Sequence, residues 1–223
     1  MFVSPTTTDL GAETRRADIH ELNEVDPGTA LRYPAGSLVL VAGLPGAGKS
    51  TLLDRVFGLR GDETRPVVSG GVLVIDSRQS RNRWARVLTP FPPRARTPLV
   101  HATHVWRIGR AVHAGHDVVA HTRGTWPHIL RGFAWLARRR GGQMHLILID
   151  VDPVTARAGQ FSRGRIVTGR TFARHCRRWR PLIRQAQAGA VPPADGVTVL
   201  DRDAADRLEH IRFGPPARSG AER

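Results

Sequence analysis

Short apolar runs alternate along the chain with stretches in which apolar residues recur every three or four positions. The apolar runs cover residues 37–43, 71–76, 117–121, 145–150 and 196–200, and they are rich in Val, Leu and Ile. Runs of this length bounded by turn residues are typical of buried strands. The helical spacing predicts helices over 49–59, 80–88, 97–113, 171–187 and 203–211, and two more that begin near 125 and 152.

This order of elements predicts an α/β fold, because a strand, a helix and the next strand form a right-handed crossover that leaves the strands parallel. We expect a three-layer sandwich around a five-stranded parallel sheet. Residues 1–36 are polar and lack sustained periodicity, which predicts an irregular N-terminal arm. Residues 37–212 are expected to form the domain, and 213–223 a disordered tail. Ligands of such sheets bind beyond the carboxyl ends of the strands.

A glycine-rich segment follows the first predicted strand and precedes the first long predicted helix. It reads Gly43-Leu44-Pro45-Gly46-Ala47-Gly48-Lys49-Ser50, and Thr51 follows it. This pattern is the phosphate-binding loop, or P-loop, in which backbone N–H groups and the helix N-terminus surround a phosphate. Lys49 then contacts the β- and γ-phosphates, and the Ser50 hydroxyl holds Mg²⁺. The sequence therefore predicts a P-loop NTPase fold that binds ATP and Mg²⁺ through residues 43–51.

Composition narrows the class of protein further. Of the 34 basic residues among 223, Lys49 is the single lysine, so it stands out where the motif requires one. Cys176 is the lone cysteine, which excludes a disulfide within the chain and favours a reducing, cytoplasmic compartment. No apolar run approaches the roughly 18–20 residues that span a bilayer, so we expect no membrane segment.

The positive charge is concentrated in the middle of the chain. Residues 77–194 carry 22 arginines against Asp117, Asp150 and Asp152. Such a block attracts anions and favours an anionic partner such as a nucleic acid. A solvated arginine-rich surface remains the other interpretation.

Several common P-loop classes lack their motifs here. The chain contains no Asn-Lys-x-Asp for guanine and no Leu-Ser-Gly-Gly of transporter ATPases. Over about residues 37–212 it resembles the P-loop kinases of the polynucleotide kinase and zeta-toxin type. Beside the P-loop, the resemblance rests on Val74-Ile-Asp76-Ser77 with Arg81, on Val118-Val-Ala-His121-Thr122, and on Asp150-Val-Asp-Pro followed by Ser162-Arg163-Gly164-Arg165.

The resemblance implies roles for these residues. Asp76 matches the general base that takes the proton of the acceptor hydroxyl, and Arg81, His121 and Thr122 match the acceptor side. The arginine-rich lid lies at about 160–170. There, Arg163 would stabilise charge on the transferred phosphoryl group, and Arg165 would contact the nucleotide.

Three of these assignments have an alternative. Asp76 could instead cap a helix or support Mg²⁺ through water, and the family's spacing between base and arginine would place the base at Arg78. Family members often carry Asp where His121 stands, and His121 could be an acceptor contact, a proton relay or a structural histidine. Asp150 ends a run typical of a Walker-B strand, whose aspartate holds Mg²⁺ through water, but kinases of this type often have an acid there without that role.

Two functions follow. The first is an ATP-dependent kinase that moves the γ-phosphate to a hydroxyl of an anionic or nucleotide-like acceptor. The second is an ATP-gated switch that binds nucleic acid or protein and transfers nothing. A third interpretation is an NTPase accessory subunit whose acceptor site has decayed. The sequence names neither the acceptor nor the oligomeric state.

Overall fold

A six-stranded sheet forms the centre of the computed structural model, which describes residues 30–85, 87–122, 126–161, 167–189 and 191–214. The strands in spatial order are β3 (Val67–Ser69), β4 (Val72–Ile75), β5 (Val118–His121), β2 (Leu38–Gly43), β6 (Met144–Ile149) and β7 (Gly196–Leu200). The last five of these are parallel, and they are the five strands that the apolar runs predict. The predicted α/β fold with a parallel sheet is confirmed.

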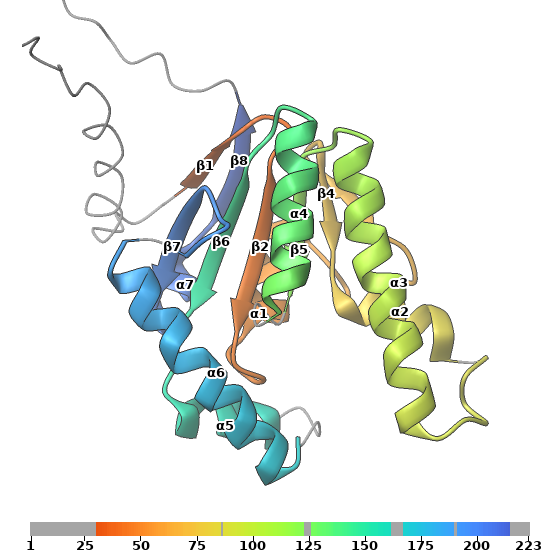
Figure 1. The fold of residues 1–223 in the computed structure, drawn as a ribbon. Coiled ribbons are helices and arrows are strands. Elements are labelled where there is room, and N and C mark those ends of the chain that lie inside the picture. Colours follow the sequence, from red (N-terminus) through yellow and green to blue (C-terminus); the bar gives the residue numbers. More distant parts are fainter. Residues whose placement is uncertain (1–29, 86, 123–125, 162–166, 190, 215–223) are drawn as a thin grey trace, which may run out of the picture.

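Helices cover both faces of this sheet (Figure 1). They are α1 (Lys49–Phe57), α2 (Ser77–Ala85), α3 (Pro93–His113), α4 (Pro127–Arg139), α5 (Pro153–Phe161), α6 (Gly169–Gln187) and α7 (Arg202–Arg207). On one face α3 and α4 lie side by side, and α1 and α7 lie on the other. Arg55 of α1 joins the latter two helices by donating to the carbonyls of Ala205 and Leu208. The result is the predicted three-layer sandwich.

The sheet has one more strand than the sequence predicts. β3 pairs antiparallel with β4 through a turn in which Gly70 and Gly71 have φ values of 57° and 83°. Two glycines with positive φ suit the tight turn of a hairpin. With three residues, β3 is too short to produce a recognisable alternation, which is why the five-stranded prediction missed it.

A second, two-stranded sheet corrects both ends of the predicted domain. β1 (Ala30–Pro34) pairs parallel with β8 (His210–Gly214). The expected irregular arm over 1–36 is therefore wrong for its last residues, where Leu31 and Tyr33 are buried and Arg32 is exposed between them. The predicted helix over 203–211 is also too long: α7 ends at Arg207, and Ile211 is buried in a strand. Of the expected tail, Phe213 and Gly214 belong to β8, and the rest lies outside the described residues.

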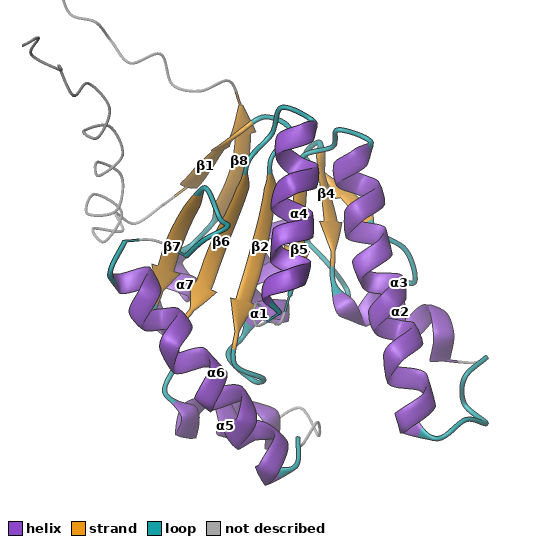
Figure 2. Cartoon of the chain, viewed as in Figure 1, coloured by secondary structure: helices purple, strands orange, loops and turns teal. Residues whose placement is uncertain are grey.

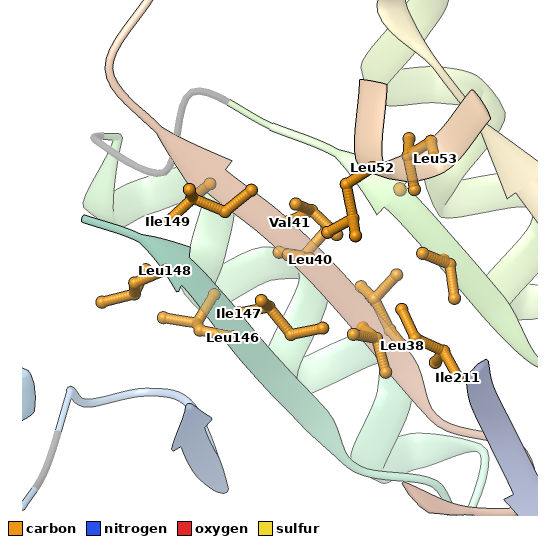
Figure 3. Close-up of a cluster of buried hydrophobic side chains, with 14 of the residues drawn as sticks. Leu38, Leu40, Val41, Leu52, Leu53, Leu146, Ile147, Leu148, Ile149 and Ile211 are labelled. Carbon is orange, nitrogen blue, oxygen red and sulfur yellow. The ribbon is translucent and has the colours of Figure 1, made fainter. Parts of the chain in front are cut away.

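The core runs along β2 and β6, where every residue of β2 is buried. Figure 3 shows Leu38, Leu40 and Val41 of β2 packed with the leucines and isoleucines of β6 and with Leu52 and Leu53 of α1. Burying a leucine or isoleucine side chain contributes about 1.5–3 kcal/mol, so the central strands are the most strongly held part of the fold. None of the described helices combines the length and the apolar character needed to cross a membrane.

The chain direction brings chemistry-bearing residues to one edge. The parallel strands β2, β4, β5 and β6 end on the same side of the sheet (Figure 2). The P-loop follows β2, Asp76 follows β4, His121 ends β5, and Asp150 follows β6. Helix α5 and the first part of α6 lie just beyond this edge.

Candidate active site

The P-loop connects the buried end of β2 to the first turn of α1. Gly46 and Gly48 have φ values of 92° and 94°, in the left-handed region that favours glycine. Gly48 is also the N-cap of α1, and no side chain caps this helix end. The N-terminus of α1, whose dipole and N–H groups favour an anion, therefore lies at the sheet edge, as the motif requires.

Helix α5 supports the loop from behind. A Cβ atom on Gly46 would lie 1.9 Å from the carbonyl oxygen of Ala156, and one on Gly159 would lie 2.6 Å from the carbonyl oxygen of Gly46. Both glycines are thus needed for the two backbones to approach. The Gln160 side chain is buried and donates from Nε2 to the Pro45 carbonyl at 3.0 Å. The loop is held in shape by the chain that follows β6.

Lys49 lies inside the loop. Its side chain is 7% exposed, and Nζ donates to the carbonyls of Gly43 at 2.9 Å and Leu44 at 2.7 Å. The ammonium group is thus held by two carbonyls of the loop itself. Ser50, next along the first turn of α1, is partly buried, and Thr51 is exposed.

Asp76 lies at the start of α2 and is 1% exposed. Its Oδ1 accepts from the backbone N–H of Arg78 at 2.7 Å, and its Oδ2 accepts from Arg78 Nε at 3.1 Å. The other end of the Arg78 guanidinium pairs with both carboxylate oxygens of Asp54 in α1. Burial by itself raises the pKa of Asp76, but His121 and Arg78 outweigh it and hold the pKa well below its ordinary value. Asp76 is therefore ionised across the physiological range.

His121 lies between Asp76 and the P-loop. Its Nδ1 is 3.6 Å from Asp76 Oδ1 and 3.1 Å from Ser77 Oγ, and its side chain is 15% exposed. Arg81 of α2 is exposed, and its charge reaches the His121 ring. Thr122, partly buried, donates its backbone N–H to the carbonyl of Val41 in β2. The structure thus brings Asp76, Arg81, His121 and Thr122 to the same side of the loop.

Comparison with known proteins agrees with this arrangement. A family model described as an AAA domain matches residues 38–182, more than half of the chain. The chain belongs to the AAA domain family. No curated protein matches the sequence.

Three solved structures that are similar to this AAA domain share little sequence with it. A structure from the PezAT chromosomal toxin–antitoxin system of Streptococcus pneumoniae is 14% identical, with a TM-score of 0.52 over 79% of this chain and 71% of that one. A tunicamycin resistance protein of Deinococcus radiodurans is 12% identical (TM-score 0.46, covering 79% and 93%). A gluconokinase from Sinorhizobium meliloti is 14% identical (TM-score 0.43, covering 80% and 91%). The predicted resemblance to P-loop kinases is confirmed as a likeness of fold.

Asp150 of this AAA domain has a structural contact that the sequence does not indicate. Its Oδ1 accepts a hydrogen bond from the indole N–H of Trp179 in α6 at 3.0 Å. Its backbone N–H donates to Leu200 of β7. Asp150 therefore links α6 to the sheet edge. If Asp150 also supports Mg²⁺, it does so with a carboxylate that already accepts the Trp179 hydrogen bond.

Arg163 and Arg165, which the resemblance assigns to a lid, lie outside the described residues. The chain on either side of them is described. Gln160, which bonds the P-loop through its amide N–H, accepts at Oε1 from the backbone N–H of Val167 at 3.0 Å. Gln160 therefore links the P-loop to Val167, the first described residue after the two arginines.

Three residues of the site escape sequence reasoning. The family spacing would place the base at position 78, but the sequence does not show that Arg78 pairs with Asp76 and Asp54 at the same time. In the sequence, Gln160 is one polar residue beside small ones, and nothing there indicates its contact with the P-loop. His104 of α3 is 6% exposed, and its Nε2 lies 2.6 Å from the His121 carbonyl oxygen. The one sequence signal for its burial is its helical spacing from Ile108 and Ala111, which are also buried.

Proposed function

We propose that this AAA domain is an ATP- and Mg²⁺-dependent phosphotransferase that moves the γ-phosphate of ATP to a hydroxyl of an anionic or nucleotide-like acceptor. The observation that carries the proposal is a phosphate-binding loop with a histidine, a carboxylate and an arginine beside it at the same sheet edge. A protein that only bound nucleotide would not need this second group of residues.

The loop side of the site binds and neutralises the triphosphate. Backbone N–H groups of the loop would face the phosphates, and Lys49 Nζ would exchange the carbonyls of Gly43 and Leu44 for β- and γ-phosphate oxygens. Phosphoryl transfer requires mainly positioning and charge stabilisation, and these groups supply both. Arg163 and Arg165 are proposed to add positive charge from the lid.

Mg²⁺ fits the chemistry of this edge through Ser50 and the phosphates. The described residues contain no cluster of three or more His, Cys, Asp or Glu that could hold a metal by itself. Mg²⁺ in nucleotide sites commonly has few protein ligands and is completed by phosphates and water, so this is the expected pattern. The ion, when bound, neutralises phosphate charge, and Asp150 is the carboxylate proposed to support it.

The acceptor side explains the preference for an anion. Arg81 lies beside His121, and residues 77–194 contain few carboxylates to balance their arginines. An acceptor with a phosphate near its hydroxyl would be attracted and oriented by this charge.

The test is transfer of labelled phosphate from γ-labelled ATP to a panel of acceptors. The panel comprises single-stranded DNA and RNA with 5′-hydroxyls, nucleotides, sugars and aminoglycosides, with Lys49→Ala as the inactive control. We expect label on one acceptor class, with ATP consumption that depends on that acceptor. Hydrolysis that no acceptor stimulates would contradict the kinase.

One observation favours the second candidate, an ATP-gated switch. Asp76 is buried and paired with Arg78, so it does not face an acceptor, as a base acting directly would. Asp76→Asn, compared at a temperature where the variant remains folded, separates the two functions, because it should lower transfer by a kinase strongly at near-normal ATP affinity and leave nucleotide binding by a switch unchanged.

A further inference from the structure

The carboxylate that the family resemblance offers as base has no free approach. Asp76 is 1% exposed, and three groups already face its two oxygens: the Arg78 N–H, Arg78 Nε and His121 Nδ1. To accept a proton from an acceptor hydroxyl, Asp76 would have to break its pairing with Arg78 and open to the site. Breaking a buried charge pair costs several kcal/mol, which a base acting in every turnover would have to overcome.

His121, in contrast, stands between this carboxylate and the phosphate site. It pairs across strands with Val41, which lies two residues before the P-loop begins at Gly43. The positive charges of Lys49 on the phosphate side and Arg81 on the acceptor side both act on its ring. The ring is also the partly exposed member of the pair, at 15% against 1% for Asp76.

We propose that His121 is the catalytic base of this domain and that Asp76 is a positioning residue that acts through it. The inference rests on the proposed phosphotransferase function and deepens it. The geometry is that of an Asp–His pair in which a buried carboxylate orients an imidazole. Arg78 keeps Asp76 ionised and in place, and His104 fixes the end of β5 by donating from Nε2 to the His121 carbonyl.

The neighbours of Nδ1 decide which nitrogen works. A lone pair on Nδ1 would face the ionised Asp76 oxygen 3.6 Å away, so the carboxylate favours the tautomer with hydrogen on Nδ1. That N–H then donates to Ser77 Oγ at 3.1 Å. The lone pair therefore lies on Nε2, which becomes the atom that accepts a proton.

The step balances as follows. The acceptor O–H bond breaks and its proton moves to His121 Nε2, while the acceptor oxygen bonds to the γ-phosphorus. The bond from the γ-phosphorus to its bridging oxygen breaks, and the electron pair leaves on ADP. The imidazolium, stabilised by Asp76, then releases its proton to water, so that ATP and the alcohol yield ADP, the phosphorylated acceptor and one proton.

The charges around His121 set the pH dependence of transfer. Burial lowers the pKa of His121, Asp76 raises it, and the cations Lys49 and Arg81 lower it again, with a net pKa below the ordinary 6.5. Arg78 acts on Asp76, and His104 beneath the strand is held neutral by burial. His121 is thus unprotonated at neutral pH. Transfer should be constant above about pH 6.5 and fall as the pH drops through the lower pKa of the histidine.

The experiment measures transfer to the best acceptor of the panel by wild type, His121→Ala, His121→Asn and Asp76→Asn, with His113→Ala at the exposed end of α3 as the matched control. Each variant is first checked for ATP affinity and thermal unfolding. We expect His121→Ala and His121→Asn to lose transfer by about 100- to 10,000-fold while still binding ATP. Added imidazole should restore activity to His121→Ala but not to His121→Asn, which fills the space.

The outcomes separate this inference from the proposed function. If wild type binds ATP and phosphorylates nothing, the kinase itself is wrong. If wild type transfers phosphate and folded His121→Asn retains its rate within a few-fold, His121 is not the base. Loss of the acidic limb of the pH profile in the residual activity of His121→Asn supports the inference, and an unchanged limb overturns it.

Discussion

His104 should make this domain less stable as the pH falls from 7 to 5, a range above the ordinary pKa values of carboxylates. His104 is 6% exposed, Nε2 donates to the His121 carbonyl at 2.6 Å, and Nδ1 is buried with no hydrogen-bond partner among the described residues. Protonation would place a buried charge on Nδ1. Burial therefore lowers the pKa of His104 from 6.5 to about 4, although the bond to His121 opposes the shift.

The sign and size follow from proton binding. Below pH 6.5 the unfolded chain takes up a proton at this histidine and the folded chain does not, so the stability present above pH 6.5 is lost as the pH falls toward 4. Between pH 7 and pH 5 the free energy of unfolding should fall by about 2 kcal/mol. Near pH 5 its slope approaches about 1.4 kcal/mol per pH unit, the maximum for one titrating group. Two kcal/mol is a substantial part of the 5–15 kcal/mol typical of a domain.

The assay is urea unfolding followed by tryptophan fluorescence at pH 7, 6 and 5. His104→Gln keeps a donor for the His121 carbonyl but does not titrate, so wild type should lose about 2 kcal/mol more than this variant between pH 7 and 5. His113→Gln, at an exposed position, should behave as wild type. Equal pH slopes in wild type and His104→Gln would refute the reasoning, because they would mean that folding does not depress the pKa of His104.

Three further predictions concern the phosphate site and the basic segment. Lys49→Ala should lower ATP affinity or turnover by orders of magnitude with an unchanged circular dichroism spectrum, and normal activity would contradict the P-loop assignment. Gly46→Ala should weaken ATP binding and destabilise the fold by about 1–3 kcal/mol in urea unfolding, because its Cβ would lie 1.9 Å from the Ala156 carbonyl oxygen. Log affinity for single-stranded oligonucleotides should fall by about 0.7–0.9 per contacted phosphate against log salt, and a flat titration would mean that residues 77–194 contact no polyanion.

The sequence predicts well what depends on neighbouring residues. The P-loop, the strand before it and the helix after it lie within 20 residues, so pattern and motif place Lys49 and Ser50 together. The parallel order also predicts that Asp76 and His121 end at one edge. Pattern alone does not show that Arg78 pairs with Asp76 while the His121 ring stays partly exposed, because the position of Arg78 also depends on Asp54 in a different helix.

The misses have a similar cause. β1 and β8 are five residues each and pair across most of the chain, so neither has a local signal strong enough to outweigh the prolines and charges around it. The predicted helix over 203–211 is too long because the helical spacing of apolar residues continues into Leu208 and Ile211. Leu208 is buried at the C-cap of α7 and Ile211 in β8. Gln160 is significant only through its contact with Pro45, more than one hundred positions away.

The contact between the P-loop and α5 has a consequence for the cost of binding. Gly46 and Gly159 touch backbone to backbone, and Gln160 bonds the loop from a buried position. The conformational entropy of the loop is therefore lost on folding and not on binding of a triphosphate. Nucleotide affinity should then reflect charge and hydrogen bonding, with little entropic loss in the loop. A substitution that loosens α5 would then lower nucleotide affinity from a distance, chiefly through the entropy of association, although none of its atoms touches the ligand.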